Sequence, residues 1–190
     1  MQKLMPTVEI ENVVASVSYD HMLDLEVIAK MLPSSRYNPQ HFPGLVYHSK
    51  KPKASMLIFS SGKVVCSGMT SERQVRRAAG KITYELKSSG IVIVNEPDVR
   101  IQNMVASLDL GGKVDLESTA YRLEKTFYDP DQFPGLVYRM ENPKITFVIF
   151  SSGKAICTGA RRKADILDGV DRLQTALEIN KLIDHTQESA

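Results

Sequence analysis

The residues with the most reactive side chains do not form a recognisable catalytic set. Ser60-Ser61-Gly62-Lys63 resembles part of a phosphate-binding loop. That loop needs a second glycine five residues before its Gly-Lys pair, and a Ser or Thr after the lysine, where Val64 stands here. The four histidines lack the spacing of a paired metal site, and no Ser, His and Asp arrangement recurs. We therefore expect no enzyme activity, no metal and no cofactor.

The two cysteines, Cys66 and Cys157, occupy equivalent places in a repeated segment, because IFSSGKVVCSG at 58–68 returns as IFSSGKAICTG at 149–159. Matched positions favour two buried thiols in a reducing compartment over a disulfide pair. The sequence also lacks the run of about eighteen apolar residues that a membrane span needs, and its N-terminus lacks the pattern of a signal peptide. We expect the protein to stay in the compartment where it is made, without a membrane partner.

The chain is an internal duplication, since residues 8–90 align with residues 99–181 without a gap. IENVVAS at 10–16 returns as IQNMVAS, and FPGLVY at 42–47 returns unchanged. Two copies are too few for a solenoid. We expect two half-domains related by a pseudo-two-fold axis, the first over residues 1–91 and the second over residues 92–190.

Each repeat is predicted to contain a strand, a helix, several antiparallel strands and a second helix, which is an α+β pattern. Asp24 is expected to cap the first helix, which Pro33 ends, and Ser71 with Gln74 forms a capping box for the second, which Gly90 ends. The SSGK segment is expected to form a hairpin turn. The strands predicted in the first repeat cover residues 8–17, 45–49, 55–60 and 63–67.

Apolar residues occupy both faces of these strands. Alternate residues point to opposite faces, so Met56 and Ile58 share one face while Leu57 and Phe59 share the other. The two helices of a repeat can cover one face, and no further predicted element covers the other. An uncovered apolar face of this kind is typical of a binding surface.

The uncovered face carries aliphatic groups, amides, hydroxyls and phenylalanines at matching positions: Asn12, Val14, Leu57, Phe59, Val65 and Ser67, then Asn103, Val105, Val148, Phe150, Ile156 and Thr158. Basic residues flank it at Lys53, Lys63, Arg139, Lys144 and Lys154. Aliphatic groups with few donors suit the minor groove of A·T-rich DNA, which offers mainly acceptors, and bulky wedges can unstack its base steps. The basic rim would hold phosphates.

These motifs resemble the TATA-binding protein family, and the resemblance covers nearly the whole chain. FPGLVY, IFSSGK and the N-terminal strand motif all recur in register in both halves. The resemblance implies a curved saddle of ten antiparallel strands with four main helices on its convex face. It also implies a general transcription initiation factor that binds a TATA-like promoter element, kinks it and recruits transcription factor B and RNA polymerase. Kinking of the minor groove is a known property of the family and does not follow from the residue pattern.

The resemblance also assigns roles to residues. Phe42, beside Pro43, and Phe59 would wedge at one end of the element, and Phe133, beside Pro134, and Phe150 at the other. Asn12 and Asn103 would donate to base acceptors, with Ser67 and Thr158 beside them; Ser67 departs from the usual threonine. The chain begins almost directly at the family core, which resembles the archaeal form. Such a protein would be cytoplasmic and nucleoid-associated in an archaeon, or nuclear in a eukaryote.

Several alternatives remain open from the residues alone. Phe59 and Phe150 could be ordinary core aromatics, and Phe42 and Phe133 could fasten their loops to the sheet. Lys63 and Lys154 could be solvated turn lysines. A basic row on the second helix could be a solvated face or a docking or DNA-flank surface: Arg73, Arg76, Arg77 and Lys81. Two other functions compete: an accessory domain of a nucleic-acid-processing enzyme, and an interaction scaffold whose apolar face closes a homodimer, weakly and without DNA.

The loops before the two FPGLVY motifs differ in charge. The first reads Asn38-Pro39-Gln40-His41, and the second reads Asp129-Pro130-Asp131-Gln132. Phosphate would repel Asp129 and Asp131, so we expect the second loop to project beyond the duplex and to meet a basic protein surface. The resemblance identifies it as the loop that transcription factor B grips.

Overall fold

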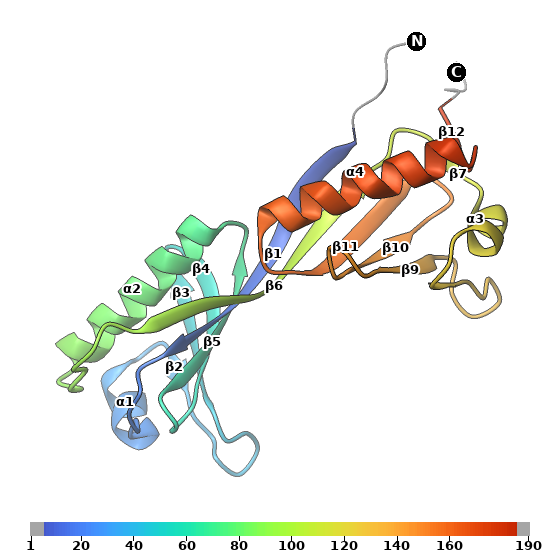
Figure 1. The fold of residues 1–190 in the computed structure, drawn as a ribbon. Helices are drawn as coiled ribbons and strands as arrows, with labels where there is room; N and C mark the ends of the chain where they lie inside the picture. Colours follow the sequence, from blue (N-terminus) through green and yellow to red (C-terminus); the bar gives the residue numbers. More distant parts are fainter. Residues whose placement is uncertain (1–5, 186–190) are drawn as a thin grey trace. The chain divides into compact units, whose positions relative to one another are not determined.

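The computed structural model describes residues 6–185, which form four α-helices and twelve β-strands (Figure 1). The helices are α1 (Leu25–Met31), α2 (Glu72–Ser88), α3 (Leu116–Arg122) and α4 (Lys163–Ile179). The strands of the first repeat are β1 (Thr7–Ser18), β2 (Ser35–Arg36), β3 (Leu45–Lys50), β4 (Lys53–Ile58) and β5 (Lys63–Met69). Those of the second are β6 (Asp98–Asp109), β7 (Lys113–Val114), β8 (Thr126–Phe127), β9 (Leu136–Met140), β10 (Ile145–Ile149), β11 (Lys154–Ala160) and β12 (Ile183–Asp184).

Ten of these strands form one antiparallel sheet in the order β2-β3-β4-β5-β1-β6-β11-β10-β9-β8, which confirms the predicted α+β class. Strands β12 and β7 pair in a separate small sheet that the sequence did not predict, because two-residue strands are too short to show alternation. Among residues 6–185, no helix is long and apolar enough to cross a membrane.

The fold divides into two compact units. One consists of Asn12–Gln102, and the other runs from Asn103 to the end of the described chain and includes the residues up to Glu11. Each unit contains one long helix packed on its strands, α2 on β5 in the first and α4 on β10 and β11 in the second (Figure 1). The units therefore repeat one local architecture.

In the Asn12–Gln102 unit, the core lies between the sheet and helix α2. Alternate residues of β1, β4 and β5 are fully buried, and they meet an apolar stripe of α2. The sheet side of this core consists of Val13, Ala15, Val17, Met56, Ile58, Val64 and Cys66, and the helix side of Val75, Ala78, Ile82 and Leu86. Burial of this face leaves the other face of the same strands for other contacts.

The second unit packs in the same way under α4. Phe147 and Ile149 of β10 and Leu173 and Leu177 of α4 are fully buried. Gly169 permits the close approach of the helix, because a Cβ there would lie 2.1 Å from Cδ1 of Ile145 and 3.3 Å from the Phe147 ring.

The helix starts follow the predicted caps, with one difference. Asp24 accepts the N–H groups of Glu26 and Val27 at the start of α1, as expected. Ser71 accepts the N–H of Gln74 at 3.3 Å, whereas the Gln74 side chain bonds the N–H of Thr70 instead of that of Ser71, so the capping box is shifted by one residue. Helix α1 ends at Met31 because Leu32, which precedes Pro33, is extended.

Both cysteines are free and fully buried, as predicted. Burial raises the pKa of the Cys66 thiol and that of the Cys157 thiol to about 12. A thiol with such a pKa is protonated and unreactive at neutral pH, so these cysteines act in packing.

Candidate nucleic-acid interface

The face of the sheet opposite α2 is less buried than the core face and is largely aliphatic. On β1, β4 and β5, residues that alternate with the buried set are half-buried, as the parity of the strands predicted. Strands β4 and β5 pair Leu57 with Val65, and Ser55 with Ser67. The half-buried set in this unit comprises Asn12, Val14, Leu57, Phe59, Val65 and Ser67.

The second unit presents an equivalent surface on β6, β10 and β11. Val148 pairs with Ile156, and Thr146 pairs with Thr158. Ile156 is 42% exposed, more than is usual for an isoleucine in the middle of a strand. The other five members are half-buried: Asn103, Val105, Val148, Phe150 and Thr158. Each unit therefore carries the predicted residues together on one surface.

The asparagine on each surface is held in one orientation by a glycine. Oδ1 of Asn12 accepts the N–H of Gly68 at 2.8 Å, and Oδ1 of Asn103 accepts the N–H of Gly159 at 2.8 Å. Both glycines have left-handed backbone angles, φ +90° and +100°, next to a break in the pairing register of β5 and β11. Because the amide oxygen is occupied, the amide NH₂ is the group left to donate.

The two asparagines differ in their second contact. Nδ2 of Asn103 lies 3.2 Å from Oγ1 of Thr158, whereas within residues 6–185 Nδ2 of Asn12 has no protein acceptor. Ser67, which takes the place of the threonine in the first unit, is half-buried beside it. An unpartnered NH₂ on a half-buried surface is suited to donate to an external acceptor.

Two phenylalanine pairs have the same geometry. The Phe42 and Phe59 rings are 6.0 Å apart at an angle of 64°, and the Phe133 and Phe150 rings are also 6.0 Å apart at 64°. This is an edge-to-face contact. Phe42 is 37% exposed and Phe133 is 46% exposed, so neither is a core residue. Their partners, Phe59 and Phe150, are half-buried.

The glycine of each FPG motif makes room for the phenylalanine pair, a role that sequence analysis missed. A Cβ at Gly44 would lie 2.7 Å from Cε1 of Phe42 and 3.1 Å from Cε1 of Phe59. A Cβ at Gly135 would lie 2.6 Å from Cε1 of Phe133. Any larger residue at this position would displace the rings. The glycine of the repeated FPG motif is therefore explained by the packing of the two rings against its backbone.

The predicted basic rim is exposed, and within residues 6–185 none of its members forms an ion pair. Lys63 and Lys154 follow hairpin turns in which Gly62 and Gly153 adopt φ +82° and +83°. The full rim comprises Lys53, Lys63, Arg139, Lys144 and Lys154. Unpaired cations beside an apolar surface can hold phosphates without first breaking internal contacts.

The acidic loop has the same backbone turn as its neutral counterpart. The carbonyl of Asp129 accepts the N–H of Phe133 at 2.9 Å, as the carbonyl of Asn38 accepts that of Phe42 at 3.0 Å. Asp129 is half-buried and Asp131 is exposed. The change from amide to carboxylate therefore alters the charge of the loop and leaves its shape intact.

Two exposed aromatic side chains lie close to this loop in the sequence and were missed by sequence analysis. Tyr121 on α3 is 92% exposed, and Phe127 on β8 is 66% exposed. Their counterparts in the first repeat are Lys30 and Arg36. Only a comparison of the repeats at positions outside the shared motifs could have found them.

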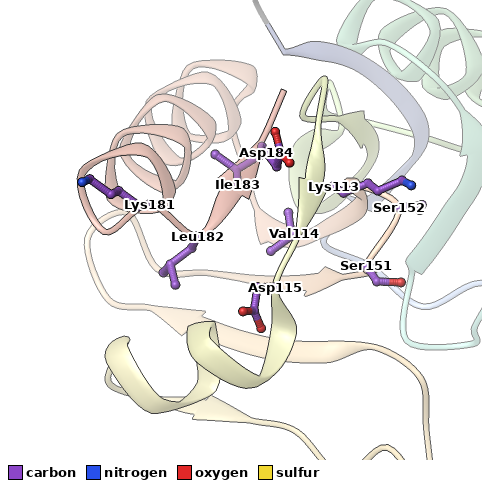
Figure 2. A pocket seen from close by; sticks show the side chains of 9 residues that line it. All are labelled: Lys113, Val114, Asp115, Ser151, Ser152, Lys181, Leu182, Ile183 and Asp184. Carbon is purple, nitrogen blue, oxygen red and sulfur yellow. The ribbon is translucent and has the colours of Figure 1, made fainter. Parts of the chain in front are cut away.

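A hollow of about 640 Å³ lies at the small β7–β12 sheet (Figure 2). Its lining comes from β7 and Asp115, from Ser151-Ser152, and from residues 181–184. Asp115 accepts the N–H and the hydroxyl of Ser118, which lowers the pKa of its carboxyl. Within the described chain there is no cluster of three or more potential metal ligands, here or elsewhere.

Comparison with known proteins gives a consistent result across the chain. The family model described as "Transcription factor TFIID (or TATA-binding protein, TBP)" matches residues 7–89 and 98–179. A TATA-box-binding protein of Pyrodictium occultum is 46% identical over 177 residues, covering 93% of this chain and 89% of the relative. One of Pyrococcus furiosus is 42% identical and covers 94% of both chains.

A solved structure, Methanococcus jannaschii TBP, has a TM-score of 0.84 and 41% identity, and covers 90% of this chain and 98% of that one. The family match falls on both repeats. The chain belongs to the TATA-binding protein family, whose members are DNA-binding transcription factors and not enzymes.

Proposed function

We propose that this protein is a general transcription initiation factor that binds a TATA-like A·T-rich promoter element through the half-buried faces of both repeats. The observation that carries the proposal is that each unit combines a phenylalanine pair, one ring of which is exposed, with an aliphatic surface and an oriented amide. Archaeal relatives named TATA-box-binding protein support it.

Readout of the base pairs rests on the aliphatic side chains and the two asparagines. In the minor groove, A·T and T·A pairs both present only the N3 and O2 acceptors, and a G·C pair adds a protruding N2 donor. Aliphatic groups such as Val65 and Ile156 can pack against A·T and T·A pairs, whereas the N2 amino group of a G·C pair would obstruct them. The amide NH₂ groups of Asn12 and Asn103 supply donors for the acceptors. The surface therefore selects A·T-rich DNA without distinguishing A·T from T·A.

The phenylalanine pairs are proposed to act as wedges. An exposed ring whose edge is held by a second ring can enter a base step, at a cost of a few kcal/mol of unstacking that the additional buried surface offsets. Flexible pyrimidine–purine steps, such as TA, lower this cost and add to the selection of sequence. The rim cations Lys63 and Lys154 would hold the phosphates of the deformed strand.

Recruitment is proposed to depend on the second repeat. Asp129 and Asp131 lie close in the sequence to exposed Tyr121 and Phe127, and the first repeat has neither these carboxylates nor these aromatic rings. Aromatic anchors with a charged rim are typical of protein interfaces. We assign these residues to the binding of transcription factor B, which would lead to RNA polymerase. If its source is an archaeon, as for the relatives named above, the protein would act in the cytoplasm on the DNA of the nucleoid.

Binding of labelled duplexes tests this function. We expect a duplex with a central A·T-rich element to bind at least about a hundredfold more tightly than a G·C-rich duplex of equal length, at the same salt concentration. Equal affinity for the two duplexes would contradict the proposed readout. The enzyme-accessory and scaffold alternatives predict no such difference.

A further inference from the structure

A second concentration of positive charge adjoins the basic rim at Lys53 and extends from there to helix α2. A hollow of about 580 Å³ opens between the β3–β4 turn and helix α2, and five cations line it with Pro52 and Gln74. The chain places β3, β4 and α2 side by side in the first unit (Figure 1). The lining cations are Lys50, Lys51, Lys53, Arg77 and Lys81.

These cations lack internal counter-charges, apart from Lys81. Nζ of Lys81 lies 3.7 Å from a carboxylate oxygen of Glu85 and donates to Oγ of Ser49 at 3.2 Å. Tyr47 also donates to Glu85, so that carboxylate is already shared. Within residues 6–185 the other four cations have no ion pair, and no carboxylate lines the hollow. Four uncompensated charges in one hollow repel one another, so an anion would stabilise them.

The second repeat provides an internal comparison. The positions equivalent to Lys50, Lys51 and Arg77 are Glu141, Asn142 and Asp168. There the charges neutralise one another locally, since Glu141 pairs with Lys125 and Asp168 pairs with Arg172 at 3.0 Å. The unpaired basic hollow is therefore a feature of one repeat and does not follow from the shared fold.

The chemistry of the lining favours phosphates over an acidic protein segment. Protein interfaces usually have apolar and aromatic side chains at their centre, whereas Pro52 is the single apolar residue of this lining. Lysine and arginine without apolar neighbours are typical of contacts to the phosphate backbone. Lys53 also belongs to the rim of the sheet surface, so the basic surface is continuous from that rim to the helix.

We propose that this hollow is a sequence-independent site for the phosphate backbone of nucleic acid, separate from the sheet surfaces that read the A·T-rich element. The phosphates belong either to the flank of the same duplex or to a second duplex. The site adds affinity without adding base specificity, because phosphate contacts carry no sequence information.

The test uses Lys51→Asn with Arg77→Gln in the full chain, since neither side chain lies on the sheet face. The matched control is Arg76→Gln with Lys87→Gln, which removes the same charge from exposed positions of α2 outside the hollow. Each protein is saturated with a short A·T-rich duplex, and binding of a labelled G·C-rich duplex is then measured. In a second arm, a long duplex with flanks is compared with the short one.

We expect the Lys51/Arg77 variant to lose about tenfold or more in one arm at low salt, and to flatten the slope of log K against log salt by about two. The arm that responds identifies the source of the phosphates. Binding of the short A·T-rich duplex, which reports on the proposed function, should stay unchanged in every variant. The proposal is overturned if the variant matches the control in both arms. Binding of labelled polyglutamate is measured alongside, and a loss of that binding with DNA binding unchanged would also overturn the proposal.

Discussion

At the scale of single residues, glycines determine how the side chains that we propose to contact DNA are oriented. Gly68 and Gly159 turn their N–H groups toward an asparagine oxygen, and Gly44 and Gly135 leave room beneath the phenylalanine rings. In both cases a glycine determines the orientation of a neighbouring side chain, the asparagine amide or the phenylalanine ring. The orientation of Asn12 leads to a direct prediction.

Asn12→Asp should weaken binding of the A·T-rich duplex by about tenfold or more, because a carboxylate replaces the NH₂ donor and faces base acceptors. The shape of the side chain is nearly the same, and the remaining oxygen can still accept the N–H of Gly68 at 2.8 Å. A titration by fluorescence anisotropy measures the change. Asn38→Asp, the same substitution on an exposed loop, is the control, and an unaltered affinity in Asn12→Asp would remove Asn12 from the readout.

The two buried thiols should make stability depend on pH in the alkaline range. Burial raises the pKa of Cys66 and Cys157 from 9.0 to about 12, so the folded state holds protons that the unfolded state releases. Their contribution is complete below pH 9 and decreases as the pH rises toward 12, by up to about 1.4 kcal/mol per pH unit for each thiol. Urea unfolding between pH 8 and 11 measures the slope.

The double variant Cys66→Val with Cys157→Val is the control for that slope, and it should lose less stability over the same range. Tyr19 contributes in the same direction in both proteins, because burial raises its pKa to about 12. Equal slopes for the two proteins would contradict this prediction, because they would show that burial does not raise the pKa of the thiols.

At the scale of elements, the two loops before FPGLVY have one backbone turn and different charges. This separates a role of shape, which positions Phe42 and Phe133, from a role of charge, which only Asp129 and Asp131 provide. We therefore expect that the loop charge can be reversed without disturbing the proposed phenylalanine wedge. Rim charges of this kind act mainly on association rate and partner choice.

Asp129→Lys with Asp131→Lys should leave DNA binding unchanged or slightly tighter and abolish the ternary complex with transcription factor B. A supershift on a labelled promoter duplex measures both. The control is Asn38→Lys with Gln40→Lys in the equivalent loop of the first repeat. If the acidic-loop variant still forms the ternary complex at the factor concentration that suffices for the unaltered protein, the partner lies elsewhere.

Periodicity and capping predicted most of the elements. Strands β1 and β3–β5 and helix α2 lie where alternation and a 3.6-residue stripe indicated, because burial on one face imposes those periods. Strands β2, β7, β8 and β12 were not predicted, since two residues show no period. The contact of Gly44 with Phe59 and the hydrogen bond of Gly68 with Asn12 were not predicted. Each joins separate strands or loops, and periodicity within one segment does not report such contacts.

At the scale of the whole molecule, the duplication supplies two equivalent surfaces, and the repeats differ at residues outside the shared motifs. Phe42, Phe59, Asn12 and Lys63 all have counterparts of the same type in the second repeat, so the two surfaces proposed to bind DNA are nearly alike. The acidic loop and the basic hollow each belong to one repeat. A nearly symmetric reader of A·T pairs cannot orient itself by base contacts alone. We therefore expect orientation to come from the unshared residues.

The central claim is that the phenylalanine pairs bend the DNA that the sheet surfaces bind. Energy transfer between dyes at the two ends of an A·T-rich duplex measures this most directly, in complexes with the unaltered protein, with Phe42→Ala plus Phe133→Ala, and with Phe127→Ala as an exposed aromatic control. We expect strong transfer with the unaltered protein and the control, and transfer close to that of free DNA with the Phe42/Phe133 variant. Because these rings are exposed, its melting temperature should fall by only a few degrees. Undiminished transfer in the saturated complex of a folded Phe42/Phe133 variant would contradict the account.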